Sequence, residues 1–278
     1  MDIAFDIYTA VLPVNRDSLR DQLFIFWFIL ASGGVMLYLT FASLSTFIFF
    51  FEFEATYFPR TIPKDGHKAE LWRQIKHEIF ISVLSIPFIA VLMAPAAVLV
   101  HRGYSRMYYN VEDYGWGYLF FSVLLFFSFT DCLVYWFHRG LHHPTLYRYL
   151  HKLHHSYKYT TPFSSHAFNP CDGFGQGVPY YTFVFLFPMH HYLFILLFLA
   201  VNMWTISIHD QVDFGGHFLN TTGHHTIHHE QFNYDYGQYF TVWDRIAGTY
   251  KPAQQTHRLP LFQKAGRVEE GKECKKLG

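Results

Sequence analysis

The feature that most limits what this chain can fold into is a series of long apolar segments without charge. The first runs from Phe24 to Phe51, 28 residues with no Asp, Glu, Lys or Arg. A second covers Ile79–Val100, and a third covers Tyr118–Phe137 with Asp131 as its one charge. Because roughly 20 apolar residues suffice for a helix to cross the hydrocarbon core of a bilayer, each segment predicts a transmembrane helix.

A fourth apolar region, Val178–Ile208, is interrupted in its middle by Pro188-Met189-His190-His191. Its first leg, 178–187, is too short to span alone, and its second leg, 192–208, is near the lower limit. We expect a helical hairpin, either re-entrant or spanning, that leaves and returns on the same side. Backbone polar groups in lipid must be satisfied internally, so the sequence predicts an all-α integral membrane protein with about four transmembrane helical segments.

The composition supports a lipid environment and excludes several function classes. Charged residues make up 15% of the chain, against roughly 25% in ordinary soluble proteins. The net charge is zero, so no long-range field would attract nucleic acid. The three cysteines have no repeated spacing, which argues against a disulfide scaffold and a cysteine-based zinc site.

The charge pattern predicts orientation and location. Five Lys and Arg residues lie in the loop after the first span, two in the loop after the second, and twelve in 138–177 together with 209–278. Because cytosolic segments carry the excess of Lys and Arg, we expect 138–177 and 209–278 to face the cytosol. The terminal Lys275-Lys276-Leu277-Gly278 is similar to the dilysine signal of endoplasmic-reticulum membrane proteins, which predicts that membrane as the location.

Histidine is the unusual residue of this chain. Of 19 histidines, 15 lie between His138 and His229. Residues three or four apart share one face of a helix, so three clusters can each offer two or three ring nitrogens to one point. The clusters are His138 and His142; His151, His154 and His155; and His225, His228 and His229. His209, at the end of the fourth apolar region, adds a ninth candidate.

Nine candidate ligands exceed the four that a tetrahedral zinc site takes, so we expect two metal ions. Imidazole nitrogens suit iron, zinc, copper or nickel. The clusters follow directly on membrane spans, where a lipid substrate would be delivered, and iron with oxygen attacks aliphatic C–H bonds whereas zinc hydroxide does not. No carboxylate lies inside a cluster, unlike the His-Glu-x-x-His pattern of zinc hydrolases. The sequence therefore favours iron.

Four further residues are candidates for orienting the ligands: Asp131, Asp213, Asp244 and His166. Asp131 lies two helical turns before His138 and either holds that ring or packs helices together. Asp213 would share a face with His209 if their helix continues. For Asp244, an ion pair with Arg245 is the favoured interpretation. His166 is equally well explained as a ligand, a substrate contact or a loop residue.

The clusters, in this order behind hydrophobic spans, resemble those of the fatty acid hydroxylase superfamily of membrane di-iron enzymes. Longer stretches are similar to its sterol C5-desaturase branch, called lathosterol oxidase in animals. They are Thr130-Asp131, Tyr135–His143, Thr161–Phe168, Asp172-Gly173-Phe174, Trp204–Asp210 and Tyr236–Arg245. Two departures are Leu153, where the family commonly has Pro, and Asn169, where it commonly has His.

This resemblance implies an O2-dependent oxidoreductase of sterol biosynthesis that introduces a C5–C6 double bond into a Δ7-sterol, as in lathosterol to 7-dehydrocholesterol. It implies two iron ions per chain held by the nine histidines in a cytosolic helical cap. It also implies electrons from NAD(P)H through a reductase and cytochrome b5, and the chain shows no Gly-x-Gly-x-x-Gly motif of its own. The expected partners are the sterol, these electron donors and the bilayer.

The predicted organisation follows from these patterns. Residues 1–117 form an N-terminal transmembrane region with two spans, 118–250 a fatty acid hydroxylase-like catalytic domain, and 251–278 a cytosolic tail. Two alternatives stay open at the level of the sequence. The same metal site would serve sterol C4-methyl oxidation or hydroxylation of a sterol or fatty acid. More distantly, the histidines would bind zinc in a membrane protein without catalytic activity.

Overall fold

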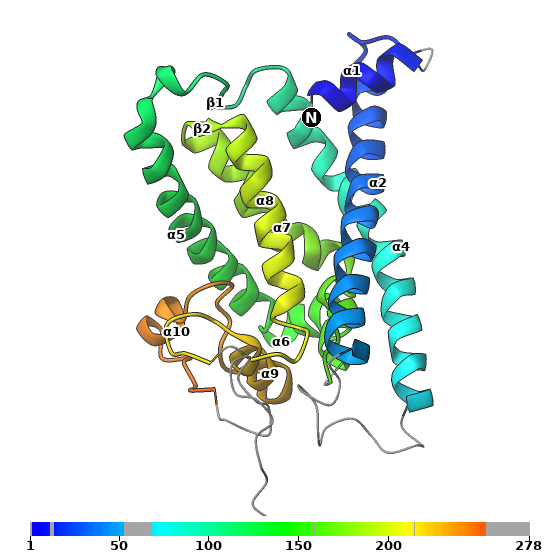
Figure 1. The fold of residues 1–278 in the computed structure, drawn as a ribbon, viewed down its shortest axis with the longest axis vertical. Coiled ribbons are helices and arrows are strands. Elements are labelled where there is room, and N and C mark those ends of the chain that lie inside the picture. The colour runs from blue at the N-terminus through cyan, green and yellow to red at the C-terminus, as the bar shows by residue number, and fades with distance from the viewer. Residues whose placement is uncertain (1, 12–13, 53–67, 158, 214, 254–278) are drawn as a thin grey trace, which may run out of the picture.

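A computed structural model describes residues 2–11, 14–52, 68–157, 159–213 and 215–253 (Figure 1). The α-helices are α1 (Asp2–Val11), α2 (Leu19–Thr46), α4 (Lys68–His101), α5 (Gly115–Leu141), α6 (Pro144–Leu146), α7 (Pro170–Leu186), α8 (His191–Ser207), α9 (Thr222–Gln231) and α10 (Val242–Ile246). Short 3-10 and π-helical segments are η1 (Phe47–Glu52), η2 (Val111–Asp113), η3 (Tyr147–His151), η4 (His154–Ser156) and η5 (Pro162–His166). Strands β1 (Met107–Tyr108) and β2 (Met189–His190) pair in parallel. The predicted dilysine signal and residues 254–278 of the predicted tail lie outside the described residues.

Three helical segments in this part of the chain are long and apolar enough to cross a membrane: Leu19–Phe49, Glu70–His101 and Gly115–Leu141. The three uncharged runs are therefore helical, as predicted. Helix α4 begins at Lys68, well before its uncharged run, and the charged residue at the junction, Glu78, is buried. Its carboxylate accepts hydrogen bonds from Thr161 Oγ1 (2.6 Å) and Gln74 Nε2 (2.7 Å).

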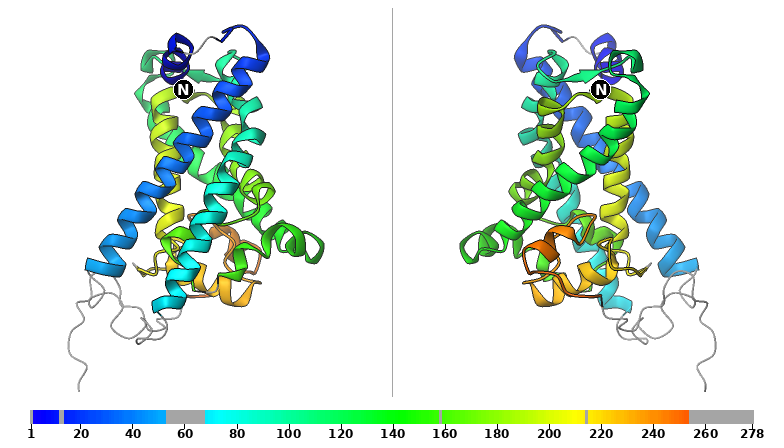
Figure 2. Two further views of the ribbon diagram at one scale, coloured as in Figure 1. Left: turned by 90° about the vertical axis from the view of Figure 1, so that its right-hand side faces the viewer. Right: turned by 90° about the vertical axis from the view of Figure 1, so that its left-hand side faces the viewer.

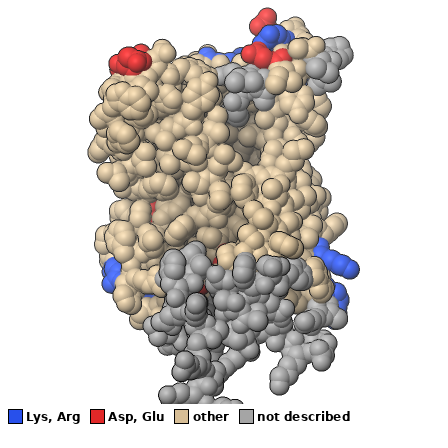
Figure 3. All heavy atoms as spheres, in the orientation of Figure 1, with Lys and Arg blue, Asp and Glu red and all other residues tan. Residues whose placement is uncertain are grey.

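The long helices lie along the long axis of the molecule (Figures 1 and 2). Helix α1 and the two strands lie at one end, and α6, α9 and α10 lie at the other. On the face drawn in Figure 3, charged side chains gather mainly at the two ends of the molecule. Large apolar side chains such as Phe88 and Leu124 are exposed between them. Such an apolar surface is costly in water and stable against lipid, so the chain is a membrane protein.

The fourth apolar region forms the expected helical hairpin, made of α7 and α8. Helix α7 begins at Pro170, earlier than the apolar residues indicated, because Asn169 caps it by accepting a hydrogen bond from the Cys171 N–H (2.9 Å). The tip of the hairpin carries β2, which pairs with β1 in the loop between α4 and α5. The hairpin therefore reaches from the end that carries α9 to the opposite end of the long helices (Figure 1).

Helices α5, α7 and α8 share one apolar core. Phe126 of α5 and Phe183 of α7 are fully buried, with ring centroids 5.2 Å apart in an edge-to-face arrangement. Phe194 of α8 approaches the same Phe126 ring at 6.4 Å. Pairs of this kind add roughly 0.5–1.5 kcal/mol each beyond the area they bury. This packing fixes α5 and α8 against each other, and both helices lead into the histidine clusters.

Candidate metal centre

Five of the nine candidate ligands meet where α5 ends. His138 and His142 lie at the C-terminal end of α5, His151 and His155 lie in η3 and η4, and His228 lies in α9. One ring nitrogen from each of these residues lies within 4.8 Å of the other four. We call this set the five-histidine group.

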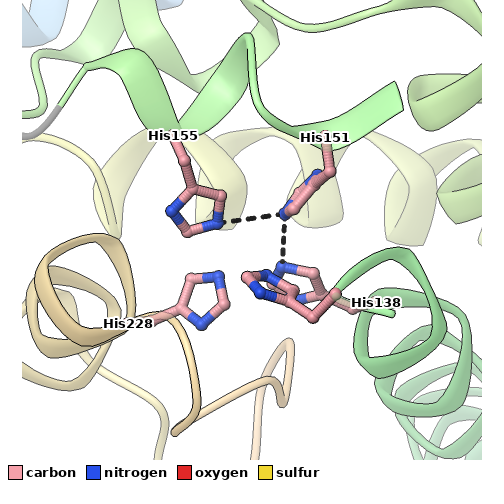
Figure 4. Close-up of side chains that lie close together, drawn as sticks. His138, His151, His155 and His228 are labelled. Carbon is pink, nitrogen blue, oxygen red and sulfur yellow. Dashed lines mark hydrogen bonds between the residues drawn. The ribbon is translucent and has the colours of Figure 1, made fainter. Parts of the chain in front are cut away.

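Figure 4 shows rings of this group facing a common point. His151 Nε2 lies 3.1 Å from both His138 Nε2 and His155 Nε2. The other nitrogens of two rings act as donors: His138 Nδ1 to the Tyr236 carbonyl (3.0 Å) and His151 Nδ1 to Asp172 Oδ2 (2.6 Å). A neutral ring carries one hydrogen. His138 Nε2 and His151 Nε2 therefore face each other as two lone pairs.

The other four candidates form a second set, the four-histidine group: His154, His209, His225 and His229. Their ligand atoms also lie within 4.8 Å of one another, and all four side chains are buried. His209 Nδ1 donates to the Thr205 carbonyl (2.6 Å). Its Nε2 therefore has no hydrogen left to share with His225 Nε2, which lies 2.9 Å away.

Both groups fit a metal ion. Two nitrogens at right angles on one ion, each about 2.1 Å from it, would be roughly 3.0 Å apart. That separation matches the Nε2–Nε2 distances of 3.1 Å in the five-histidine group and 2.9 Å in the four-histidine group. His142 Nε2 and His228 Nε2 are buried and have no hydrogen-bond partner among the described residues. Buried lone pairs without a partner are costly unless a cation takes them, and imidazole donors suit iron.

Burial sets the charge state of these rings. Burial first, and the neighbouring rings second, hold the pKa of His154, His225, His228 and His229 well below the ordinary 6.5. Burial lowers the pKa of His209 to about 3. A neutral imidazole is the form that binds metal. The protein therefore presents its ligands ready to bind at neutral pH.

Asp172 holds one candidate ligand in place, although no pattern in the sequence predicted a role for it. Its Oδ2 accepts the His151 Nδ1–H, its Oδ1 accepts from Gln176 Nε2 (2.7 Å), and its side chain is fully buried. A carboxylate on the far nitrogen of a metal-binding ring fixes the orientation of the ring and raises its basicity. The signal that could have found Asp172 is an acidic residue in the first turn of the helix that begins at Pro170.

Asp131 and Asp244 orient a ligand only through the backbone. Asp131 Oδ1 accepts from the N–H groups of Gln238 (3.1 Å) and Tyr239 (2.7 Å). Asp244 accepts from the N–H groups of Tyr236 and Gly237, both at 2.9 Å. The two carboxylates thus hold segment 236–240, whose Tyr236 carbonyl accepts the His138 Nδ1–H.

The favoured interpretation of Asp244, an ion pair with Arg245, was wrong. The Asp244 carboxylate instead accepts hydrogen bonds from the two backbone N–H groups and from Thr249 Oγ1.

Asp213 and His166 lie outside both groups. Helix α8 ends at Ser207, so Asp213 does not share a helical face with His209, and the condition for that prediction fails. Asp213 instead accepts a hydrogen bond from the Gly215 N–H (3.0 Å). His166 contacts Ser165 Oγ and Asn202 Oδ1 and lines the cavity described below.

The sequence clusters do not correspond to the groups in space. His151 and His155 belong to the five-histidine group, whereas His154 between them belongs to the four-histidine group. The third cluster divides in the same way, with His228 on one side and His225 and His229 on the other. The second cluster lies on π-helical and 3-10 turns and the third on α9. In both, the residues four apart stay in one group and the residue between them joins the other group.

A cavity of about 520 Å3 leads from the lipid-facing helices to the four-histidine group. Helices α2, α4, α7 and α8 supply walls that are mainly apolar. Three rings of the four-histidine group line it, those of His154, His209 and His225, but only His138 of the five-histidine group does. Gly33 lines the cavity on α2 and is exposed, so the cavity opens beside that helix toward the lipid. An apolar molecule can reach the histidines from the bilayer by this route.

Comparisons with known proteins agree with this chemistry. The sequence profile of the fatty acid hydroxylase family matches residues 123–249. The chain is 48% identical over 192 residues to lathosterol oxidase of Rattus norvegicus, covering 66% of this chain and 64% of that protein. It is 41% identical over 252 residues to lathosterol oxidase of Mus musculus, covering 88% of this chain and 80% of that protein.

A fungal relative is similar over the same length. The Delta(7)-sterol 5(6)-desaturase of Schizosaccharomyces pombe is 40% identical over 246 residues, which cover 88% of this chain and 79% of that protein. No solved structure matches the chain. The likeness to named enzymes therefore extends beyond the metal-binding half and includes the apolar N-terminal helices.

Proposed function

Since this chain belongs to the fatty acid hydroxylase family, we propose that it is a membrane sterol 5(6)-desaturase that converts a Δ7-sterol to the 5,7-diene. The observation that carries the proposal is the cavity, which joins lipid-facing helices to the four-histidine group. The relatives named for this reaction are about 40–48% identical to the chain. A sterol would enter beside α2 with its rings toward the histidines.

We propose that the nine histidines bind two iron ions, one in each group. The four-histidine group leaves more coordination positions free than the five-histidine group, and it lies against the cavity. Iron there would supply the O2 activation that breaking an aliphatic C–H bond requires. The chain's own residues orient and bury the site: Asp172 holds His151, and the Tyr236 and Thr205 carbonyls hold His138 and His209.

The electron balance calls for an external donor. Removing two hydrogens from the sterol gives two electrons and two protons, whereas reducing O2 to two waters takes four of each. The other two electrons must come from a redox partner. We propose cytochrome b5, reduced from NAD(P)H through its reductase, as that partner.

The proposed location is the endoplasmic-reticulum membrane, with the histidine groups as a cytosolic cap. The ends of α2 and α5 that lie near these groups, and the start of α4, share one end of the molecule (Figures 1 and 2). Among the described residues, Lys and Arg side chains at the end of α5, in η3, in α10 and at the start of α4 support this orientation, among them Arg139, Arg148 and Arg245. We propose that the α7–α8 hairpin crosses the bilayer as well, because its tip pairs with the loop at the far end. Residues 118–250 would then be the catalytic domain and 1–117 a transmembrane region.

Expression in cells that lack sterol C5-desaturation tests the function, with sterols identified by mass spectrometry. We expect a product two mass units lighter than the Δ7-sterol supplied. A product sixteen units heavier would show hydroxylation instead, and loss of a C4-methyl group would show C4-methyl oxidation. Zinc binding with no oxygen consumption would contradict an oxidase of any kind.

A further inference from the structure

One pair of polar side chains in the cavity wall forms no hydrogen bond to either histidine group within the described part of the chain. His166 Nε2 lies 3.2 Å from Asn202 Oδ1, and both residues line the cavity. His166 Nδ1 lies 3.0 Å from Ser165 Oγ, which itself donates to the Pro162 carbonyl (2.7 Å). Asn202 Nδ2 donates to the Phe198 carbonyl one turn earlier in α8 (2.7 Å). These contacts fix Asn202 Oδ1 toward His166 at the surface of the cavity.

The pair is one hydrogen short. Burial lowers the pKa of His166 to about 4, so its ring is neutral at pH 7 and carries one hydrogen. Three contacts need a hydrogen: Ser165 with Pro162, Ser165 with His166, and His166 with Asn202. The Ser165 hydroxyl and the His166 ring supply two. One acceptor facing the cavity or Ser165 is therefore left unpaired, which is unfavourable in an apolar wall.

The pair lies close to the four-histidine group. Asn202 and Thr205 are three residues apart and so lie on one side of α8. The Thr205 carbonyl accepts a hydrogen bond from His209 Nδ1 just past the end of that helix. The Phe168 ring lies 6.0 Å from both the His166 and the His154 rings. A molecule whose reacting carbon faces the four-histidine group would thus have His166 and Asn202 beside it.

A sterol has a single polar group, the hydroxyl on C3, and one ring carbon separates C3 from C5. The hydroxyl must therefore lie close to the reacting carbons, within the same polar end of the cavity. A hydroxyl carries one hydrogen and two lone pairs, so it can give the pair the hydrogen that it lacks. We propose that His166 and Asn202 bind the substrate hydroxyl and thereby position C5 and C6. This inference rests on the proposed function and names the residues that determine its specificity.

The other neutral amides at this end of the cavity already support the metal ligands. Gln176 Nε2 donates to Asp172, the partner of His151. Gln238 Nε2 donates to Thr205 Oγ1 (2.9 Å), and the Gln238 backbone N–H is held by Asp131. The His166–Asn202 pair forms no such bond to a residue that holds a ligand, so it is free to serve the substrate.

The test compares a Δ7-sterol with its 3-deoxy analogue, the same steroid without the hydroxyl. For the unaltered enzyme we expect kcat/KM to be about 10- to 100-fold higher for the sterol, as for sites built to bind a hydroxyl. In Asn202→Leu and His166→Phe, we expect kcat/KM for the sterol to fall about 10-fold, mostly through KM. The rate with the deoxy analogue should stay within about twofold. His166→Gln, which keeps a polar group, should restore part of the preference.

A purely structural tie between η5 and α8 would predict an equal loss for both substrates, and that result would overturn the inference. Thr182→Val is the matched control, because it removes a hydroxyl from α7 that does not line the cavity and that donates to the Val178 carbonyl (2.9 Å). It should change neither rate. A thermal-shift titration of the purified protein with both steroids reads hydroxyl recognition without turnover. If the enzyme makes no diene, the proposed desaturase function is refuted. If the sterol and its deoxy analogue stabilise the protein equally, the proposed binding of the hydroxyl by His166 and Asn202 is refuted.

Discussion

The five-histidine group and the four-histidine group are built from the same side chain but have different surroundings. In the five-histidine group His142 is partly exposed, and the half-buried ring of Tyr147 lies 5.5 Å from it. In the four-histidine group every ring is buried, and three of the four line the substrate cavity. Only the five-histidine group has, among the described residues, a carboxylate bonded to a ring. The two groups therefore differ in the number of rings and in access to the cavity rather than in the type of side chain, and under the proposed function these differences would give the two sites different roles.

Removing one ligand from either group should have the largest effect. We expect His154→Ala in the four-histidine group and His228→Ala in the five-histidine group to lower product formation by more than about 100-fold, since even residues that only orient a ligand are worth 10–100-fold. Each variant should lose the iron of its own group and keep the other. Iron analysis of the purified variants, beside sterol analysis of cells, measures both. Wild-type levels of product in either variant would refute the assignment.

Asp172→Asn removes the carboxylate that distinguishes the five-histidine group, without removing a candidate ligand. The amide cannot hold the His151 Nδ1–H as the carboxylate does, so we expect activity or iron affinity to fall about 10- to 100-fold. The loss should be confined to the five-histidine group. Asp213→Asn is the control, because that carboxylate accepts only from a nearby backbone N–H among its described contacts, and it should be near neutral. Equal effects of the two substitutions on activity and iron affinity would show that Asp172 does not support the metal site.

Acid should destabilise the metal-free protein, because its buried histidine rings stay neutral in the folded state. The folded-state pKa of His209 is about 3, below the ordinary 6.5, so below pH 6.5 the unfolded chain takes up a proton that the folded chain excludes. Stability is therefore full above pH 6.5 and falls as pH drops, by up to about 1.4 kcal/mol per pH unit for each such ring. We expect the metal-free protein to melt at a lower temperature at about pH 5.5 than at about pH 7.5. A melting temperature that rises on acidification would contradict the conclusion that these buried rings are neutral in the folded protein.

The iron-loaded protein extends the same comparison. Protons compete with metal for imidazole, and the carboxylate of Asp172 favours a hydrogen on the far nitrogen of His151. The four-histidine group, which lacks such a partner among the described residues, should therefore lose its ion first as pH falls. Iron release followed during slow acidification should show two steps, with activity lost in the first.

Narrowing the cavity should have the smallest effect. A Cβ added at Gly33 would meet no atom within 4 Å, so Gly33→Leu fits the fold and places its side chain at the cavity opening. We expect KM for the sterol to rise a few-fold, less than the roughly 10–200-fold that one extra methylene inside an apolar pocket causes, because the added side chain lies at the opening. The iron content should not change. A change in iron content with constant KM would mean that the opening lies elsewhere.

The sequence predicted which residues form the site better than it predicted how they are grouped in space. The uncharged runs predicted the spans, because length and hydropathy alone decide whether a helix suits lipid. The nine histidines were found from their number and spacing, and the structure brings all nine together. Their division into five and four could not be predicted, because the clusters on the π-helical and 3-10 turns and on the regular helix α9 divide in the same way. Which ring joins which group depends on how these elements pack together.

The residues that support the ligands were the hardest to predict. Asp172 contacts His151 across 21 positions of sequence, and Tyr236 contacts His138 across 98. Such contacts depend on how α7 and segment 236–240 pack on α5, which no local pattern encodes. Asp131 was a candidate because a charge at membrane depth is costly, and it was expected either to hold the His138 ring or to pack helices together. Its actual partners are backbone N–H groups more than 100 positions away.

The measurement that tests the central claim most directly is a titration of the metal-free enzyme with ferrous iron, with diene formation from a Δ7-sterol followed in parallel. Two iron sites of unequal surroundings predict that activity stays low until about two ions per chain are bound. His225→Ala, which alters only the four-histidine group, should bind about one ion and remain inactive. Full desaturation with one ion per chain, or in His225→Ala, would contradict the account.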